Sequence, residues 1–523
     1  MKKPNMVFII ADDLGWNDVS LHGSDQIPTP NIDLLALSGV AFSRYYSHAI
    51  CTPSRSALLS GKYSHRTGMQ GYPLSMSEDR GLPVTEKILP QYLKQAGYAT
   101  YLVGKWHVGS SRNEFLPTSR GFDYHFGHRG GFTDYYEYTI EETFSPVGTV
   151  CGLPLFRNLT PAWDVEGYIT DVYTDHATSI IEKHDTSSPL FLMVAHNAPH
   201  ASNVAAALQA PPKDVRQMRH IELVSRRIFA AMVKKLDDSV GEIVKALYDK
   251  GILENTVITF VSDNGGMTSG EYQNFASNYP LRGLKTSPFE GGIRVVGLMW
   301  SANLNNSDHH WNGYMHVSDW LPTLLTAAGV EVPSGIDGIN HWENINLNAA
   351  SDRTVMYEID DYTGFASMIM GDFKLITGNI NEATSNYQGA YLRAKMGEEP
   401  NYRDALSSST VYKVLKSLGR PFNMTNLSRL RRNTVIECDS TSTSICQPSN
   451  SISCLYNILE DPCETTDLSK VHPELVEEMT ILLKKEYATR IPRKVPVYRD
   501  PLAVPREANN FTWNTWVPDA TPF

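Results

Sequence analysis

Two pairs of oxygen-bearing side chains in the sequence have the chemistry of a site for a hard cation. Asp12-Asp13 follows the apolar run Val7–Ala11, and Asp263-Asn264 closely follows the β-branched run Thr256–Val261. Calcium and similar ions bind carboxylate and amide oxygens, and three carboxylates brought together without a cation would repel one another. Taken separately, each pair would more often form a turn or a helix cap. Their shared position at strand ends favours a metal site.

The segment Cys51-Thr52-Pro53-Ser54-Arg55 combines a cysteine with an anion site. Proline is tolerated in the first turn of a helix, and the residues from Ser54 to Leu59 have helical character. Cys51 therefore lies just before a helix N-terminus, where free N–H groups and the helix dipole favour anions. Arg55 adds a fixed cation one turn further on. A buried or disulfide-bonded cysteine is the alternative for this segment alone.

Two more groups of polar residues follow predicted strands. Lys105 and His107 come after Thr100–Val103, and His200 comes after Leu190–Ala195. Ligands of open α/β sheets bind beyond the carboxyl ends of the strands, so these residues meet at one edge if the four strands are parallel. Taken singly, Lys105 and His107 could lie on a surface loop, and His200 could be a hydrogen-bonded core histidine.

The overall charge means that an anion site would need local cations. The net charge is −11 and the pI is near 5.8, which argues against a nucleic-acid-binding protein and gives no general attraction for an anion. Lys285 is a candidate for such a local charge, although a lone lysine is more often solvated. We expect His196 to pack behind the site rather than to take part in catalysis.

The 523 residues are enough for two or three domains. Strand-like and helix-like segments, including a long amphipathic helix at Arg226–Tyr248, alternate over residues 1–350. This predicts an α/β domain with a mostly parallel central sheet flanked by helices. Residues 351–523 contain alternating segments such as Ser367–Ile376 and a helix at Pro473–Tyr487. They predict a smaller C-terminal α+β domain with an antiparallel sheet and a tail that packs on the first domain.

Cysteine and sequon usage favours an oxidising compartment. Four of the six cysteines lie between residues 438 and 463, and disulfides Cys438–Cys446 and Cys454–Cys463 are one possibility that spacing alone does not prove. No C-x-x-C pair occurs, so zinc is not expected. N-glycosylation sequons begin at Asn158, Asn305, Asn423, Asn426 and Asn510. Together these features predict the secretory pathway, with a lysosomal or secreted protein.

The N-terminal sequence does not match a signal peptide or a membrane anchor. The apolar run Met6 to Ala11 is shorter than a signal core of roughly 7–15 residues and is better interpreted as a buried strand. No apolar run approaches the ~18 residues that span a membrane. We therefore expect that any signal peptide has been removed from this sequence.

Several sequence phrases together resemble the type I sulfatase family. They are ADDLGWNDVSLHGS, CTPSRSALLSGKY, LVGKWHVG, VSDNGG, PLRGLKTSPFEGGIR, DWLPTLLTAAG and LYNILEDPCE. The resemblance covers most of residues 5–375 and resumes near residue 454, whereas residues 377–450 show little of it. It implies an alkaline-phosphatase-like α/β fold.

The resemblance also implies a catalytic apparatus. Cys51 would be oxidised to Cα-formylglycine by the formylglycine-generating enzyme, and the hydrated aldehyde would attack sulfur and pass through a formylglycine-sulfate intermediate. One Ca²⁺ would be held by Asp12, Asp13, Asp263, Asn264 and the modified Cys51. The remaining implied roles are Arg55 steadying the diol, Lys105 bridging it to sulfate, His107 as base, and His200 and Lys285 binding sulfate and acting as general acid.

The implied reaction is hydrolysis of an organic sulfate ester to an alcohol and inorganic sulfate. N-acetylgalactosamine 4-sulfate or aryl sulfates are the substrates that the resemblance favours. The phrases GSDQIPTPNIDLLA and GMQGYPLSMSEDRG are more similar to invertebrate members, some of which act on glucosinolates. The alternatives are a phosphoester hydrolase of the same superfold and, if Cys51 is unmodified, a non-catalytic binder of sulfated glycans. Tyr135, Tyr136 and the segment 377–450 are candidates for the specificity pocket, and the oligomeric state is left open.

Overall fold

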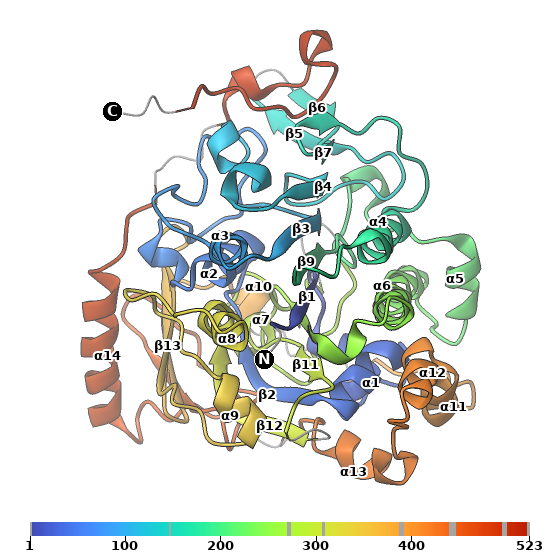
Figure 1. Cartoon of the computed structure of the whole chain (residues 1–523). Coiled ribbons are helices and arrows are strands. Elements are labelled where there is room, and N and C mark those ends of the chain that lie inside the picture. The colour runs from blue at the N-terminus through green and yellow to red at the C-terminus, as the bar shows by residue number, and fades with distance from the viewer. Residues whose placement is uncertain are drawn as a thin grey trace.

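The computed structural model describes residues 3–145, 148–268, 274–305, 309–385, 392–438, 446–493 and 499–519. Its largest element is a ten-stranded mixed sheet (Figure 1). The strands lie in the order β12 (His309–His316), β2 (Val40–Tyr46), β11 (Gly297–Ser301), β10 (Thr256–Ser262), β1 (Asn5–Ala11), β9 (Leu190–Ala195), β3 (Ala99–Gly104), β4 (Tyr124–His128), β7 (Leu155–Arg157) and β8 (Thr160–Pro161).

The centre of this sheet is parallel, as the sequence predicted. Strands β10, β1, β9, β3 and β4 pair in parallel, and β11, β7 and β8 join the sheet by antiparallel pairing. Parallel strands expose their carboxyl ends at one edge, so the loops that follow β1, β9, β3 and β10 begin side by side.

Helices cover both faces of the sheet because β1 is apolar on both sides. Val7 and Ile9 belong to one hydrophobic core, and Phe8 and Ile10 belong to the other. The first core is closed by α1 (Pro30–Ser38), α4 (Ile169–Lys183), α5 (Pro212–Gln217), α6 (Val224–Asp249) and α12 (Thr410–Ser417). The second is closed by α2 (Cys51–Ser60), α3 (Leu89–Gln95) and α8 (Trp320–Ala327) (Figure 1).

A separate four-stranded antiparallel sheet follows the large one, which confirms the predicted fold class. Its strands are β13 (Val355–Asp360), β14 (Phe365–Met370), β15 (Phe373–Gly378) and β16 (Cys454–Asn457). The predicted segment Ser367–Ile376 therefore contains parts of two strands, β14 and β15, joined by a turn. Helix α14 (Pro473–Tyr487) packs on one face through Met479 and Leu483, and Phe289 and Ile293 contact the other face.

The remaining elements are short. They are α7 (Glu290–Ile293), α9 (Trp342–Leu347), α10 (Glu382–Ser385), α11 (Tyr402–Ser408) and α13 (Leu427–Arg432), with the hairpin β5 (Ile140–Phe144) and β6 (Gly148–Gly152). Leu406 of α11 and Val411 of α12 pack in the first core of the large sheet, although both follow residue 350. Trp513 of the tail packs against Ile140 and Phe144. The domain boundary near residue 350 stays a prediction.

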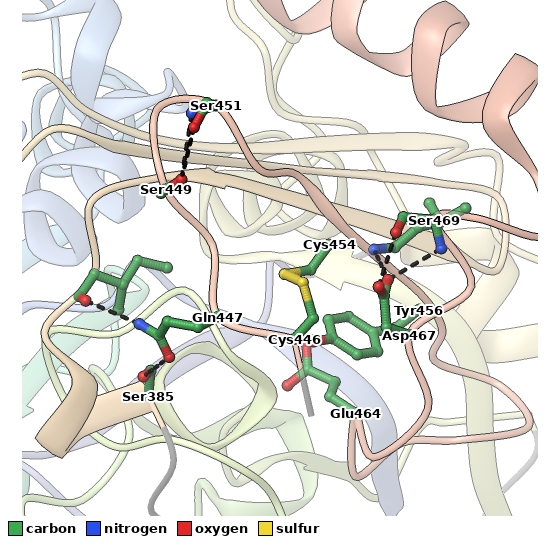
Figure 2. The surroundings of a disulfide bond; sticks show 12 residues. Ser385, Cys446, Gln447, Ser449, Ser451, Cys454, Tyr456, Glu464, Asp467 and Ser469 are labelled. Atoms are coloured by element: carbon green, nitrogen blue, oxygen red, sulfur yellow. Dashed lines mark hydrogen bonds between the residues drawn. A yellow bond between two sulfur atoms is a disulfide. The ribbon is translucent and has the colours of Figure 1, made fainter. Parts of the chain in front are cut away.

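The predicted disulfide pairing is wrong. The bonds join Cys438 to Cys463 and Cys446 to Cys454, with Cα–Cα distances of 6.0 and 5.8 Å. The chain reverses between Ser449 and Ile452, which brings Cys446 beside Cys454 at the start of β16. Figure 2 shows this bond and the neighbouring contact between Gln447 and Ser385 at the end of α10. Within the described ranges, no helix is both long enough and apolar enough to cross a membrane.

Candidate active site

Backbone hydrogen bonds between neighbouring strand ends bring the predicted residues together. Lys105 N donates to Ala195 O over 2.8 Å, His196 N donates to Ile10 O over 2.9 Å, and Asp263 N donates to Ala11 O over 3.1 Å. Gly104 makes the close approach of β3 to β9 possible. It adopts φ +102°, and a Cβ added there would lie 1.9 Å from Ala195 O. Only glycine fits at position 104, and the close approach that it permits places Lys105 at the sheet edge.

The four predicted oxygen donors lie together and are buried. Asp13 adopts φ 64° and its N–H donates to Asp263 Oδ1 over 3.3 Å, while Asn264 Nδ2 donates to Asp13 Oδ1 over 2.7 Å. Asp12 Oδ1 and Asn264 Oδ1 have no hydrogen-bond partner among the described residues. A buried oxygen without a partner is costly unless a ligand reaches it.

Each of the three carboxylates is paired with one cation. Lys105 Nζ lies 2.8 Å from Asp12 Oδ2, Lys285 Nζ lies 2.8 Å from Asp13 Oδ1, and Arg55 Nη2 lies 2.8 Å from Asp263 Oδ2. These cations come from three separate loops or helices. The pairing keeps the buried cluster close to neutral, which limits the cost of removing so many charges from water.

The carboxylates respond differently to burial. Burial raises the pKa of Asp12 to about 7, with Lys105 opposing the shift and Asp263 adding to it. Burial also acts against ionisation of Asp13, but Lys285 and His200 outweigh it and lower the pKa of Asp13 to about 2. The neighbouring carboxylates Asp263 and Asp13 therefore help to raise the pKa of Asp12, whose second oxygen has no hydrogen-bond partner among the described residues.

Cys51 is the first residue of α2 and is 2 % exposed. It forms no disulfide. Burial raises the pKa of its thiol above the usual value, and the nearby charges of Lys105 and Lys285 only partly oppose that shift. A thiol with a raised pKa is mostly protonated at neutral pH and is a poor nucleophile. The position is central to the site, but the unmodified side chain is not activated.

His107 presents one ring nitrogen without a partner. It adopts φ 60°, its Nε2 lies 2.9 Å from Leu74 O, and its Nδ1 has no hydrogen-bond partner within the described ranges. Thr52 fixes this geometry, because its hydroxyl donates to His107 O over 3.1 Å and accepts from Leu74 N over 3.1 Å. Burial, reinforced by Lys105, lowers the pKa of His107 well below its usual value. A neutral ring with a proton on Nε2 leaves Nδ1 as a base.

His200 contacts both Lys285 and Asp13. Its Nδ1 donates to Ala201 O over 2.5 Å, and its Nε2 lies 3.3 Å from Lys285 Nζ and 3.6 Å from Asp13 Oδ2. Burial lowers the pKa of His200 to about 3, so the ring is neutral at neutral pH. Tyr135 positions this loop, because its hydroxyl donates to His200 O over 2.8 Å.

The residues predicted to form the site thus meet at one edge of the sheet. His196 points behind the site, where its Nε2 lies 3.0 Å from Ser239 Oγ. Tyr135 is buried and supports the His200 loop, whereas Tyr136 is 41 % exposed. No pattern in the sequence indicated Thr52 and Leu74 as positioning residues. Leu74 acts through its backbone carbonyl, for which no side-chain pattern exists.

The site can accept a divalent metal. Asp12, Asp13 and His200 each offer a ligand atom, and these atoms all lie within 4.8 Å of one another. The unpartnered oxygens of Asp12 and Asn264 add hard donors. A group of residues that could hold a metal, next to two lysines, an arginine and a neutral histidine at the carboxyl edge of an α/β sheet, is the arrangement expected of a metal-assisted ester hydrolase.

Comparison with known proteins identifies the family. The sequence pattern described as Sulfatase matches residues 4–330, and the chain belongs to the sulfatase family. It is 36 % identical to arylsulfatase J of Mus musculus over 520 residues, which cover 98 % of this chain and 80 % of the relative. It is 31 % identical to N-acetylgalactosamine-6-sulfatase of Mus musculus over 68 % of each chain. The protein is thus a sulfuric ester hydrolase of the arylsulfatase type.

Solved structures agree with this assignment. The crystal structure of Ps i-CgsB in complex with k-i-k-neocarrahexaose matches with a TM-score of 0.74 and 27 % identity. The match covers 98 % of this chain and 100 % of that one. A sulfatase from Pseudoalteromonas sp., PsFucS1, matches with a TM-score of 0.66 and 25 % identity over 93 % and 90 % of the two chains.

Proposed function

We propose that the enzyme hydrolyses sulfate esters with a formylglycine made from Cys51 and one calcium ion. The observation that carries this proposal is the placement of Cys51. It is buried at the start of α2, inside the field of two lysines and two carboxylates, yet its thiol is not activated. Hydrated formylglycine supplies two hydroxyls, one to attack sulfur and one to help expel sulfate, and this explains why a central cysteine needs no raised reactivity of its own.

Asp12, Asp13, Asp263 and Asn264 would hold the calcium together with the modified Cys51. All four donors offer oxygen, which calcium prefers, and none offers the sulfur or paired imidazoles typical of structural zinc. A bound calcium supplies positive charge that polarises the sulfate group. The unpartnered oxygens of Asp12 and Asn264 support this assignment.

Lys105, Lys285 and Arg55 would hold the negative charge of the sulfate and of the attacking group. Each already lies against one carboxylate of the cluster, so each is fixed before substrate arrives. Charged donors fixed in a water-poor site stabilise a developing anion more strongly than solvent does. Arg55 lies one turn after Cys51 on α2, which suits it to orient that side chain.

His107 would accept a proton at Nδ1. Its Nε2 faces the carbonyl of Leu74, so the proton of the neutral ring resides there and Nδ1 carries the lone pair. The lowered pKa of His107 keeps the ring unprotonated well into the acidic range. The base form therefore persists at the pH of an acidic compartment.

Lys285 and His200 would act together on the leaving oxygen. The neutral His200 accepts from Lys285 through Nε2, so the ammonium of Lys285 is the proton source of the pair. Asp13 lies against the same ammonium and raises the pKa of Lys285 above its usual value. His200 then orients the ammonium toward the substrate, and Lys285 protonates the alcohol.

The substrate is proposed to be a sulfated sugar of the N-acetylgalactosamine 4-sulfate type. Two relatives support a glycan, since one is named N-acetylgalactosamine-6-sulfatase and another was solved with k-i-k-neocarrahexaose. A glucosinolate remains the alternative that the N-terminal phrases suggest. Assaying one N-acetylgalactosamine 4-sulfate glycan against one glucosinolate separates them, and turnover of the glucosinolate alone would overturn the glycan assignment.

The secretory route is also proposed. The two disulfides and the five sequons support an oxidising compartment, where the formylglycine-generating enzyme would meet the chain. Mass spectrometry of the tryptic peptide Tyr45–Arg55 tests the central claim, because the aldehyde form is lighter than the thiol form. An unmodified thiol in active enzyme would remove the mechanism, and an unmodified thiol in inactive protein would favour a glycan-binding role.

A further inference from the structure

A groove rich in arginine lies outside the active site, where α11 and α13 meet the loop that follows β1. Its volume is about 640 Å³, within the range of ligand-binding clefts. Gly23, Asn401, Tyr402, Arg403, Arg431 and Arg432 form much of its lining. None of the residues that line it is acidic. We call it the arginine groove, and Figure 1 shows α11 and α13 near α1 at the lower right.

The charge of this region is opposite to that of the protein. Residues 392–438 contain nine lysines and arginines against four acidic residues, whereas the whole chain carries −11. Among the residues that the structure describes, Arg403, Arg431 and Arg432 form no ion pair with a carboxylate. A local excess of unpaired cations on an acidic protein is a feature that an anionic ligand would neutralise.

The arginines are held by neutral groups and keep donors available. Arg431 donates through Nε to Ser20 O and through Nη2 to Ser24 O, over 2.9 and 3.1 Å, and its guanidinium stacks on Tyr402 at 4.1 Å. Arg403 donates to Met424 O over 2.9 Å. Backbone carbonyls orient these side chains, and the carboxylate of Asp33, which accepts from the Tyr402 hydroxyl over 2.8 Å, is the acidic group in the field of Arg431. The fork of a guanidinium matches two oxygens of a sulfate group.

The groove is connected to the active site through the loop after β1. This loop starts at Asp12-Asp13 and contains Gly23, which lines the groove. Asp13 and Gly23 are ten positions apart in the chain, so the two lie no more than about 35 Å apart. A polysaccharide longer than this span can contact the groove and the active site at the same time.

We propose that the arginine groove binds a sulfated polysaccharide at units remote from the sulfate that is hydrolysed. The proposal rests on the proposed function, because a sulfatase acting on a polymer meets further sulfates along the same chain. The groove would then lower the KM for polymeric substrates and leave the chemical step unchanged. Binding energy gained outside the reacting centre that is equal in the ground and transition states has this effect.

The test compares two charge-matched double variants. Arg403→Gln with Arg432→Gln removes two exposed cations from the groove and leaves Arg431, which holds the loop, in place. Lys413→Gln with Lys416→Gln removes two exposed cations from α12, which does not line the groove. Thermal unfolding of both proteins establishes that each is folded. The probes are chondroitin 4-sulfate, unsulfated hyaluronan and a small aryl sulfate.

The groove variant should bind chondroitin 4-sulfate about tenfold more weakly at moderate salt, with a KM for this polymer raised by a similar factor. Its kcat, its turnover of the aryl sulfate and its weak binding of hyaluronan should be unchanged, and the α12 variant should behave like the wild type. Equal weakening in both variants, no weakening in either, or tighter binding of duplex DNA or anionic vesicles than of the sulfated polymer would overturn the proposal. Wild-type protein that binds the polymer but hydrolyses neither substrate would instead contradict the proposed function alone.

Discussion

Two clusters of fully buried charges in this enzyme differ in how completely their polar atoms are paired. Between the large and small sheets, Lys374 Nζ lies 3.0 Å from Glu290 Oε1 and 2.9 Å from Glu464 Oε1. Tyr46 donates to the second oxygen of Glu290 over 2.9 Å, and Glu290 N donates to the second oxygen of Glu464 over 2.7 Å. Every carboxylate oxygen of this interface cluster therefore contacts a polar group, although Glu464 Oε1 forms no hydrogen bond among the described residues and is held only by its ion pair with Lys374.

The active-site cluster contains the same kinds of residue, but several of its polar atoms have no partner within the described part of the chain. Asp12 Oδ1, Asn264 Oδ1 and His107 Nδ1 have no hydrogen-bond partner among the described residues. Asp13 and His107 also adopt left-handed backbone conformations, at φ 64° and 60°, which non-glycine residues rarely do. Burial and charge alone thus do not distinguish a functional cluster from a structural one. A left-handed backbone does not distinguish them either, because Glu464 of the interface cluster adopts φ 53°. The distinguishing feature is the presence of buried polar atoms that have neither a hydrogen bond nor an ion pair.

The largest effect is expected for Cys51→Ser. Serine keeps the position at the start of α2 but has one hydroxyl where the hydrated aldehyde has two. Sulfate could be transferred to it, but His107 would find no second hydroxyl to deprotonate, and water must then attack sulfur. Multiple turnover should fall at least a thousandfold, and a sulfated serine should appear as a mass adduct on the peptide from Tyr45 to Arg55.

Cys151→Ser is the matched control, because Cys151 is the other free cysteine and is exposed. This variant should retain wild-type activity. Full multiple turnover by the Cys51→Ser variant would show that Cys51 is not the precursor of an aldehyde, and the proposed mechanism would be wrong.

Removal of the metal should have the next largest effect. A calcium chelator should reduce kcat by about a hundredfold or more and lower the unfolding temperature, because Asp12, Asp13 and Asp263 would again be close together without a cation. Calcium should restore both properties. The interface cluster should not respond, so Glu464→Gln should leave the response to chelation unchanged. Restoration by zinc but not by calcium would contradict the calcium assignment.

His200→Ala should separate two kinds of substrate. Because His200 is proposed to orient Lys285 toward the leaving oxygen, its loss should matter most when the leaving alcohol is a poor one. We expect a decrease of about a hundredfold for a sugar sulfate and only a few-fold for an activated aryl sulfate. Steady-state kinetics on both substrates measure the ratio. Equal decreases would exclude His200 from proton transfer and leave it a structural role.

The convergence of the active-site residues could be predicted from the sequence because the sheet geometry is general. Apolar runs such as Val7–Ala11 indicate strands buried on both faces, and parallel strands place their carboxyl ends at one edge. The positions of Asp13 and Lys105 follow from that rule. Thr52 and Leu74 do not, because their contacts with His107 depend on the path of a loop that has no periodic pattern.

The disulfide pairing and the arginine groove of the C-terminal part were harder to predict, because they also depend on the path of loops and on long-range contacts. Four cysteines allow three pairings, and the turn between Ser449 and Ile452 decides which one forms. The arginine groove depends on short helices such as α13, whose position is set by contacts with residues Ser20 and Ser24, far away in the sequence. Long-range contacts of this kind leave no local signal.

The smallest expected effect concerns the interface cluster and pH. Burial raises the pKa of Glu464 to about 7, although Lys374 opposes the shift, while an unfolded glutamate titrates near 4.5. Between these values the folded protein holds a proton that the unfolded chain has released, so this group favours folding below about pH 4.5. That contribution is progressively lost as the pH rises to 7.

The loss is on the order of 1–3 kcal/mol in the free energy of unfolding. Glu464→Gln imitates the protonated side chain at every pH, so the variant should lose less stability than the wild type between pH 5 and pH 8. Chemical denaturation across that range measures the two slopes. Parallel slopes would show that Glu464 is ionised in the folded protein throughout. Lys374, Glu290 and Glu464 would then all stay charged across this pH range. The interface cluster would differ from the active site only because the active site has unpaired polar atoms.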